Sequence, residues 1–215
     1  MERIAIINYN MGNLHSVGRA VQHVAPMAQI DITSDPKLIL SADRIVFPGQ
    51  GAARDCMGEL YRLGLAEVVL EVTKTKPFLG ICMGMQVLMQ HSDENQGISC
   101  LGLYAGQVKH FSTAHSASAS PDTERLKIPQ MGWNQVWQMQ SHPLWRGIED
   151  GARFYFVHSY YVVPENNGLQ AGMTDYGVHY TSALAADNVF AIQCHPEKSA
   201  RDGLRLLENF VNWSI

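Results

Sequence analysis

The sequence predicts an α/β fold in which an open, mainly parallel sheet carries helices on both faces and gains antiparallel strands in its second half. Over roughly the first ninety residues, short apolar runs alternate with stretches of helical periodicity. This alternation is typical of parallel strands joined by crossover helices. Beyond Gly97 the segments become short, strand-like and bounded by turns, which indicates added antiparallel strands.

The first half of the chain contains four predicted strands, at residues 3–9, 28–33, 42–47 and 78–81. Helices are predicted at residues 14–24, 53–73 and 83–91, with a short helical link that opens at residues 34–36. Asn13 is the predicted N-cap of the first helix, and Gly58 and Gly64 weaken the second. Because parallel crossovers are right-handed, the loops after these strands meet at one edge of the sheet, which receives Asn10, residues 49–51 and Cys82.

The second half is predicted to contain strands at residues 103–111, 127–128, 133–137, 154–163, 169–174, 178–185 and 189–193. Residues 112–122 are rich in serine and alanine and predict a mobile loop. The last helix is predicted at residues 199–214, with Ser199 as its cap. Its inward face should consist of Leu204, Leu207, Phe210 and Val211.

Length and composition describe an ordinary globular protein. The 215 residues allow one domain with a full core, predicted to span residues 1–215, or at most two small ones. The net charge is −4 and no cluster of Lys or Arg is present, which argues against a nucleic-acid partner. No apolar run could span a membrane and no secretory signal opens the chain, so a cytoplasmic location is expected. The four cysteines lack metal-ligand spacing, and neither a metal nor a cofactor is predicted.

Cys82 is the candidate nucleophile. It stands between an apolar run and a stretch of helical periodicity, with Gly80 two positions before it and Gly84 two positions after it. This is a strand–nucleophile–helix turn of the Gly-x-Ser-x-Gly type with sulfur in place of oxygen, and glycine avoids side-chain clashes in so tight a turn. The N–H groups of the following helix favour the reactive thiolate. A cysteine in an apolar stretch is more often a small buried hydrophobe, but both flanking glycines favour the nucleophile.

His195 is the candidate base. It follows a buried strand, at the carboxyl end where active sites of open α/β sheets collect, and Pro196 ends that strand. Glu197 lies two residues on, and positions i and i+2 of an extended chain face the same way. Its carboxylate can then orient the imidazole and stabilise the charged form. On its own, His-Pro-Glu is equally a polar turn at a strand end; the Cys82 turn favours the catalytic interpretation.

A third candidate feature is the loop Pro48-Gly49-Gln50-Gly51, which follows a hydrophobic strand and precedes a helix. Glycines let such a loop present consecutive N–H groups to an anion or oxyanion. Acyl transfer through a thioester needs these donors because charge develops on the carbonyl oxygen. The N–H of Met83 is a second natural donor. Taken alone, a glycine-rich loop after a strand is more often a plain turn.

Two motifs together carry a family resemblance. Residues 80–86 read Gly-Ile-Cys-Met-Gly-Met-Gln and residues 194–199 read Cys-His-Pro-Glu-Lys-Ser, and this pair resembles the triad-type (class I) glutamine amidotransferases, which have a flavodoxin-like fold. Within that family, the glutaminase subunit of imidazole glycerol phosphate synthase is the most similar branch. Four further stretches match this branch, at residues 8–14, 48–52, 129–134 and 156–160. The pieces that select it are Met-Gly-Asn-Leu at residues 11–14 and Gln-Met-Gly-Trp-Asn at residues 130–134.

The resemblance implies an activity and a set of roles. L-glutamine is attacked by Cys82, a glutamyl thioester forms, and His195 and Glu197 complete the triad. Gln86, one turn beyond Cys82, is assigned to holding the substrate, as are the backbones of Ser159 and Tyr160. The ammonia passes to a (β/α)₈-barrel cyclase subunit that makes imidazole glycerol phosphate and an aminoimidazole carboxamide ribotide in histidine biosynthesis. The residues implied at the interface of this heterodimer are Asn13, Trp133 and Lys198.

One departure from the family pattern is Gln50, where the family loop often carries valine; a polar side chain there leaves the backbone donor in place.

Three alternative functions stay open on the sequence alone. In the first, the chain is another class I amidotransferase, one that feeds anthranilate, aminodeoxychorismate, GMP or pyridoxal phosphate synthesis. Or it is a cysteine hydrolase, such as a γ-glutamyl hydrolase or a protease on a similar sheet. Or it is a binding subunit with an inert thiol.

Overall fold

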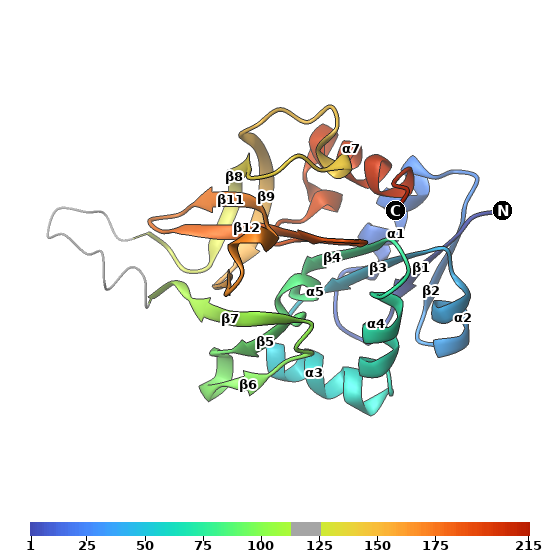
Figure 1. Cartoon of the computed structure of the whole chain (residues 1–215), viewed down its shortest axis with the longest axis horizontal. Helices are drawn as coiled ribbons and strands as arrows, with labels where there is room; N and C mark the ends of the chain where they lie inside the picture. The colour runs from blue at the N-terminus through green and yellow to red at the C-terminus, as the bar shows by residue number, and fades with distance from the viewer. Residues whose placement is uncertain (113–125) are drawn as a thin grey trace, which may run out of the picture.

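The computed structural model describes residues 1–112 and 126–215, and their strands join in one large mixed sheet (Figure 1). The order along its main path is β2-β1-β3-β4-β13-β12-β10-β7-β5-β6, and β11, β8 and β9 branch from β12. The strands are β1 Arg3–Ile7, β2 Gln29–Thr33, β3 Arg44–Gly49, β4 Phe78–Cys82, β5 Met89–Ser92, β6 Ile98–Ser99, β7 Tyr104–His110, β8 Gln130–Gln138, β9 Ala152–His158, β10 Tyr160–Pro164, β11 Gln170–Asp175, β12 His179–Ala186 and β13 Val189–Ile192.

The parallel half of the sheet consists of β2, β1, β3, β4 and β13, and all four pairings among them are parallel. Helices cover both of its faces: α1 and α7 pack together on one side, and α3 and α4 lie on the other (Figure 1). The helices are α1 Leu14–Val24, α2 Pro36–Ser41, α3 Ala53–Arg62, α4 Ala66–Val72, α5 Met83–Gln86 and α7 Ala200–Val211. The predicted α/β architecture, including the antiparallel additions around β12, is confirmed.

Asn13 caps α1 as predicted, because its side-chain oxygen accepts from the Ser16 N–H at 3.3 Å. The predicted helix at 53–73 is two helices, α3 and α4, that separate at Gly64, where φ is +66°. The third strand is shifted toward the carboxyl end and runs through Gly49. This shift brings the glycine-rich loop alongside the end of β4.

The predicted helix at 83–91 is wrong beyond Gln86. The helix α5 is a single turn, and the chain re-enters the sheet as β5 after Leu88. Val87, Leu88 and Met89 are all fully buried, so this segment has no polar face for a surface helix. Its apolar spacing fits a helix and a buried strand equally well, and pairing with β6 and β7 decides for the strand.

The second half differs from the prediction at three places. Residues 154–163 form two strands, β9 and β10, which break at Ser159 and pair with different neighbours, β8 and β7. Residues 127–128 are not a strand, and β8 begins only at Gln130. The predicted loop at 112–122 lies outside the described residues apart from Ser112. Both halves of 154–163 are apolar, so hydrophobic pattern alone does not reveal the break.

Ser199 precedes α7 but does not cap it through its side chain. Its hydroxyl instead donates to the His195 carbonyl at 2.6 Å and accepts from the Tyr155 N–H at 2.9 Å. Leu204 is only half-buried, and Leu206 occupies the inward position in its place. The hydroxyl therefore joins β9 to the segment after β13 rather than ending a helix. Among the residues that the structure describes, no helix has the length and apolarity to cross a membrane.

Candidate active site

Cys82 lies at the end of β4 in a strained backbone conformation, with φ +56° and ψ −109°. A Cβ on Gly84 would overlap the carbonyl oxygen of Phe47 in β3, and a Cβ on Gly80 would lie 2.8 Å from the Gly84 oxygen. The predicted need for both glycines is therefore confirmed, although the obstacles are the neighbouring strand and the turn itself. Positive φ at a non-glycine residue is costly, and such strained residues cluster at functional sites.

His195 and Glu197 form a buried pair in which Nδ1 lies 2.8 Å from the carboxylate Oε1. A carboxylate only accepts, so the Nδ1–H donates and Nε2 is the nitrogen that remains for chemistry. The expected extended geometry is not the one observed, because Glu197 lies in a 3₁₀ turn, Pro196–Lys198. This turn places the carboxylate beside the imidazole Nδ1. The backbone N–H of His195 donates to the Tyr155 carbonyl at 2.9 Å.

The pKa of His195 is strongly shifted. Burial alone would lower it, but the interactions with Cys82 and Glu197 outweigh burial and raise the pKa to about 10. The imidazole is therefore charged at neutral pH, between the sulfur of Cys82 and the carboxylate of Glu197. A charged imidazole at this position can donate its proton to the leaving group of an acyl compound that the sulfur attacks.

Cys82 and His195 open on a common cavity of about 570 Å³. Its volume lies within the range of small-molecule sites, about 300–1,000 Å³. The described residues that line it are Asn10, Met11, Gly12, Gln50, Gly51, Cys82, Met83, Gln86, Glu94, Pro129, Val157, His158, Ser159, Tyr160, His195 and Lys198. The structure thus brings together most of the candidate residues; Gly49, Glu197, Asn13 and Trp133 are not among the residues that line this cavity.

The glycine-rich loop begins directly beside the nucleophile, because Gly49 is the register partner of Cys82 in the β3–β4 pairing. A Cβ on Gly49 would collide with the Tyr9 hydroxyl and lie 2.8 Å from the Met83 Cβ. Only glycine allows so close an approach. Gln50 and Met83, whose N–H groups are the two expected oxyanion donors, both line the cavity.

Cys56, for which the sequence predicts no role, supports this loop from below. Its thiol donates to the Gln50 carbonyl at 3.6 Å and accepts from the Tyr9 hydroxyl at 3.9 Å. Burial raises the pKa of Cys56 to about 12, so the S–H remains available as a donor. The peptide between Gln50 and Gly51 is thereby held in one orientation.

Gln86 is buried at the base of the cavity, and both of its N–H groups are engaged. Nε2 donates to the Tyr160 carbonyl at 3.1 Å and to the Gln193 Oε1 at 2.9 Å. Any contact of this side chain with a substrate therefore falls to its carbonyl oxygen. The Tyr160 carbonyl also pairs with the His158 Nδ1 at 2.7 Å, and burial lowers the pKa of His158 to about 4. The segment at Ser159 and Tyr160 is thus fixed by two buried side chains.

Glu94 is a second residue that the sequence pattern does not predict. It is the only acidic side chain among the described residues that line the cavity. Its Oε2 accepts from the Ala53 N–H at 2.6 Å, at the start of α3, which fixes the carboxylate at the rim. No pattern in the sequence links Glu94 to Ala53, forty-one residues away.

The three expected interface residues lie at different places. Trp133, on β8, is 47% exposed and packs edge-on against Tyr155 at 6.3 Å between ring centroids. The Lys198 ammonium lies 5.9 Å from the centroid of the same Tyr155 ring and lines the cavity. The exposed Asn13 instead caps α1. Trp133 and Lys198 therefore share one aromatic neighbour at the mouth of the site.

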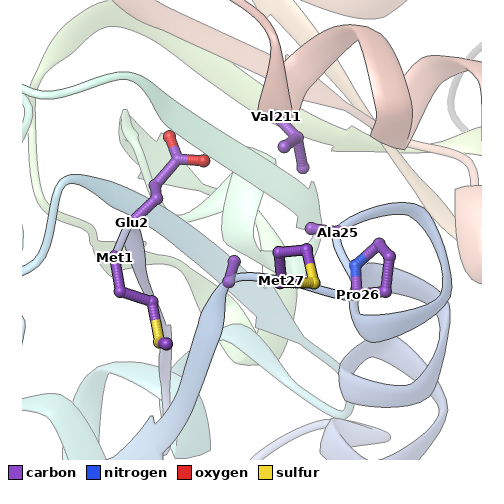
Figure 2. A pocket seen from close by; sticks show the side chains of 7 residues that line it. Met1, Glu2, Ala25, Pro26, Met27 and Val211 are labelled. Atoms are coloured by element: carbon purple, nitrogen blue, oxygen red, sulfur yellow. The ribbon is translucent and has the colours of Figure 1, made fainter.

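A second cavity, of about 450 Å³, shares no lining residue with the Cys82 cavity, and Figure 2 shows it from close by. It is lined by Met1, Glu2, Ala25, Pro26, Met27, Ala28 and Val211. The carboxylate of Glu2 is paired with Arg44. The side chains that line it offer no nucleophile and no unpaired base, so it supplies no chemistry to the site described above.

A thiol at a strand end, a buried imidazole–carboxylate pair and a backbone loop around one cavity define a thiol enzyme of the acyl-transfer class on an open α/β sheet. Residues 5–213 match the family Glutamine amidotransferase class-I. The chain is 54% identical to the imidazole glycerol phosphate synthase subunit HisH of Dechloromonas aromatica, covering 99% of this chain and 97% of that protein. The chain belongs to the class I glutamine amidotransferases and, within them, to the HisH subunits. The family resemblance of its motifs is confirmed.

Further comparisons agree. The HisH subunit of Acinetobacter baylyi is 51% identical, covering all of both chains. Among solved structures, a putative GMP synthase component from Thermoplasma acidophilum aligns with a TM-score of 0.69 at 16% identity, covering 99% of this chain and 93% of that one. A structure described as a glutamine amidotransferase aligns with the same TM-score at 13% identity, covering 97% of each chain. At these identities the solved structures support the fold alone.

Proposed function

We propose that this protein is the glutaminase subunit of imidazole glycerol phosphate synthase, which hydrolyses L-glutamine to glutamate and ammonia in the cytoplasm for histidine biosynthesis. The observation that carries the proposal is the convergence of Cys82, His195 and the Gln50 loop on one cavity. This occurs in a chain that is 54% identical, over nearly its whole length, to a HisH subunit. The chain acts as one domain, residues 1–215.

The reaction proceeds through a thioester. The thiolate of Cys82 attacks the side-chain carbonyl of glutamine, and the N–H groups of Gln50 and Met83 hold the oxyanion. His195 donates its proton to the departing nitrogen, so ammonia leaves and the glutamyl thioester remains. A water molecule then loses a proton to His195 and attacks the thioester, releasing glutamate and restoring the thiolate. Glu197 keeps the imidazole in the required orientation throughout.

The amino-acid end of glutamine needs charged or polar partners. Glu94 is the acidic group at the cavity, so its carboxylate is the partner for the α-ammonium group. The backbone at Ser159 and Tyr160 holds the same end, and the carbonyl oxygen of Gln86 contacts the substrate. Neither a metal nor a cofactor takes part in this scheme.

Replacing Glu94 with glutamine tests this assignment. Glu94→Gln keeps an oxygen for the Ala53 N–H but removes the negative charge, so KM for glutamine should rise about ten- to a hundred-fold, the value of a charge-assisted hydrogen bond. Turnover at saturating glutamine should change much less, because the reacting atoms are untouched. Steady-state kinetics provide the measurement, with the exposed neighbour Asp93→Asn as the matched control. An unchanged KM in Glu94→Gln would remove this residue from substrate binding.

The partner in this proposal is a (β/α)₈-barrel cyclase subunit that receives the ammonia. Four large apolar side chains on β8 and just beyond it support a docking surface, because they are exposed and stand at alternate positions on one face of the strand. These are Met131, Trp133, Trp137 and Met139. Asn13 and Lys198 are proposed to lie at the same interface.

The test is glutamine hydrolysis by this protein with and without the barrel cyclase and its phosphorylated ribulosyl substrate. Hydrolysis should increase when the cyclase and its ligand are present, and imidazole glycerol phosphate should form with glutamine as nitrogen source. Trp133→Ala should weaken the complex and reduce glutamine-dependent product. Hydrolysis of γ-glutamyl peptides at rates equal to those with free glutamine would instead support a peptidase, and product formation with a different synthase would place the chain in another amidotransferase branch.

A further inference from the structure

The side chain of Gln193 is completely buried and contacts the nucleophile. It lies directly after β13, two residues before His195, and its Nε2 donates to the sulfur of Cys82 at 3.7 Å. Its own backbone N–H is held by the Ser182 carbonyl at 2.8 Å. The side chain is therefore fixed at both ends, with one amide N–H directed at the reacting atom.

The orientation of this amide follows from the hydrogen bonds around it. The Tyr160 carbonyl can only accept, so the Gln86 side chain must present its NH₂ group there. The second N–H of Gln86 then requires an acceptor, which is the Gln193 Oε1 at 2.9 Å. With its oxygen committed to Gln86, the Gln193 amide has only its NH₂ group to offer the sulfur. The Tyr160 carbonyl on β10 thus determines, through Gln86, that Gln193 presents an N–H donor to the Cys82 sulfur.

We propose that Gln193 is a catalytic residue that stabilises the Cys82 thiolate through a direct N–H donor, and that Gln86 is the positioning residue that fixes this donor. The inference rests on the proposed glutaminase chemistry, which needs a thiolate. Hydrogen bonds to an anion in a buried site are stronger than neutral ones, so the donor favours the thiolate over the thiol. When the thioester forms, the sulfur loses its charge and this bond weakens.

The other titratable groups around the sulfur keep their protonation near neutral pH, so they do not confound the effect of this donor. His195 carries a charge at neutral pH, with Glu197 behind it. Burial raises the pKa values of Tyr9, Cys56 and Cys194 well above neutral, so these three stay protonated there. With these four groups protonated near neutral pH, a change in the pH dependence of Cys82 alkylation reports the loss of the Gln193 donor.

The test is the pH profile of Cys82 alkylation by iodoacetamide on the full-length protein, followed at this cysteine by peptide mass spectrometry. Gln193→Met keeps the size of the side chain but removes the donor. The midpoint of the profile should rise by about one pH unit, which is a roughly ten-fold slower alkylation below it. Gln86→Met should shift the midpoint in the same direction by a smaller amount. The turnover of glutamine should fall with little change in KM.

The matched control is Gln130→Met, which removes another buried amide, one bonded to His158 and Tyr180 rather than to Cys82. It should lower the melting temperature and leave the alkylation midpoint unchanged. If Gln193→Met does not fold, Gln193→Glu keeps the acceptor for Gln86, places an acid at the sulfur and should also raise the midpoint. A midpoint within about 0.2 units of the wild type in a folded variant overturns the proposal, since loss of a charge-assisted donor shifts a pKa by more than this. Alkylation does not involve glutamine, so it tests the donor separately from the proposed function. A shifted midpoint in the variant, with a wild-type protein that does not hydrolyse glutamine, would refute the proposed function and still support the Gln193 donor.

Discussion

Cys82→Ala is expected to abolish glutamine-dependent synthesis while synthesis from free ammonium continues. In the proposed mechanism the sulfur is the atom that bonds to the glutamyl carbon, and the other triad members have no reaction to assist without it. The loss of glutamine hydrolysis should be on the order of 10⁴- to 10⁶-fold, as for the removal of a triad nucleophile. The measurement is product formation by the complex with the barrel cyclase, with glutamine or ammonium as nitrogen source.

The control for this substitution is Cys100→Ala. Cys100 is a buried thiol outside the cavity, so its removal should leave both nitrogen sources usable. A glutamine-analogue electrophile should label Cys82 in the wild type and nothing at that position in Cys82→Ala. If folded Cys82→Ala in an intact complex lost both glutamine-dependent and ammonium-dependent synthesis, the proposal that this subunit releases ammonia and the cyclase uses it would be contradicted. Retained glutamine use would exclude the thioester.

The turn around Cys82 is the part of the site that the sequence predicts best, and the structure explains why. Packing the turn against β3 leaves no room for a Cβ at Gly84, because the carbonyl of Phe47 occupies that space. A local steric requirement of this kind leaves a local signature, Gly-x-Cys-x-Gly. The same holds for Gly49, whose approach to Tyr9 and Met83 excludes a side chain.

Contacts between distant segments leave no such signature. Gln86 bonds to Tyr160 across 74 positions and Gln193 to Cys82 across 111, so the role of each amide depends on a residue that no spacing rule reaches. Gln193 is therefore predicted only as the end of a strand. The clue available in the sequence is a polar residue at the end of an otherwise apolar run, just before His195.

The helix predicted at 83–91 is wrong for a related reason. Apolar residues at helical offsets follow Cys82, and the spacing satisfies a helix. The tertiary structure instead requires this segment to continue the sheet beside β7, and burial of three consecutive residues overrides the local pattern. The short helix and the early return to the sheet place two residues at the site. A single turn, α5, presents the Met83 N–H, and the early return to the sheet leads the chain on to Glu94 at the rim.

His195→Ala is expected to reduce glutamine hydrolysis nearly as much as Cys82→Ala, because the members of a triad act as a unit. Without the imidazole, no group protonates the departing ammonia or activates the water. Glu197→Gln should be milder, about 10²- to 10⁴-fold, since glutamine can still orient the ring but cannot stabilise its charge. Ammonium-dependent synthesis should survive in both variants. An unchanged rate in Glu197→Gln would remove this carboxylate from the mechanism.

The raised pKa of His195 also makes a prediction about stability, with a definite sign. The folded protein holds the imidazole proton up to about pH 10, whereas the unfolded chain releases it near the ordinary value of about 6.5. The stabilisation from this group is thus complete below about pH 6.5 and is lost as the pH rises through about 10. Denaturant unfolding at pH 7 and pH 10 should show a larger loss of stability in the wild type than in His195→Ala, which lacks the group that releases this proton. Equal losses would mean that the folded site does not retain the imidazole proton above its ordinary pKa range.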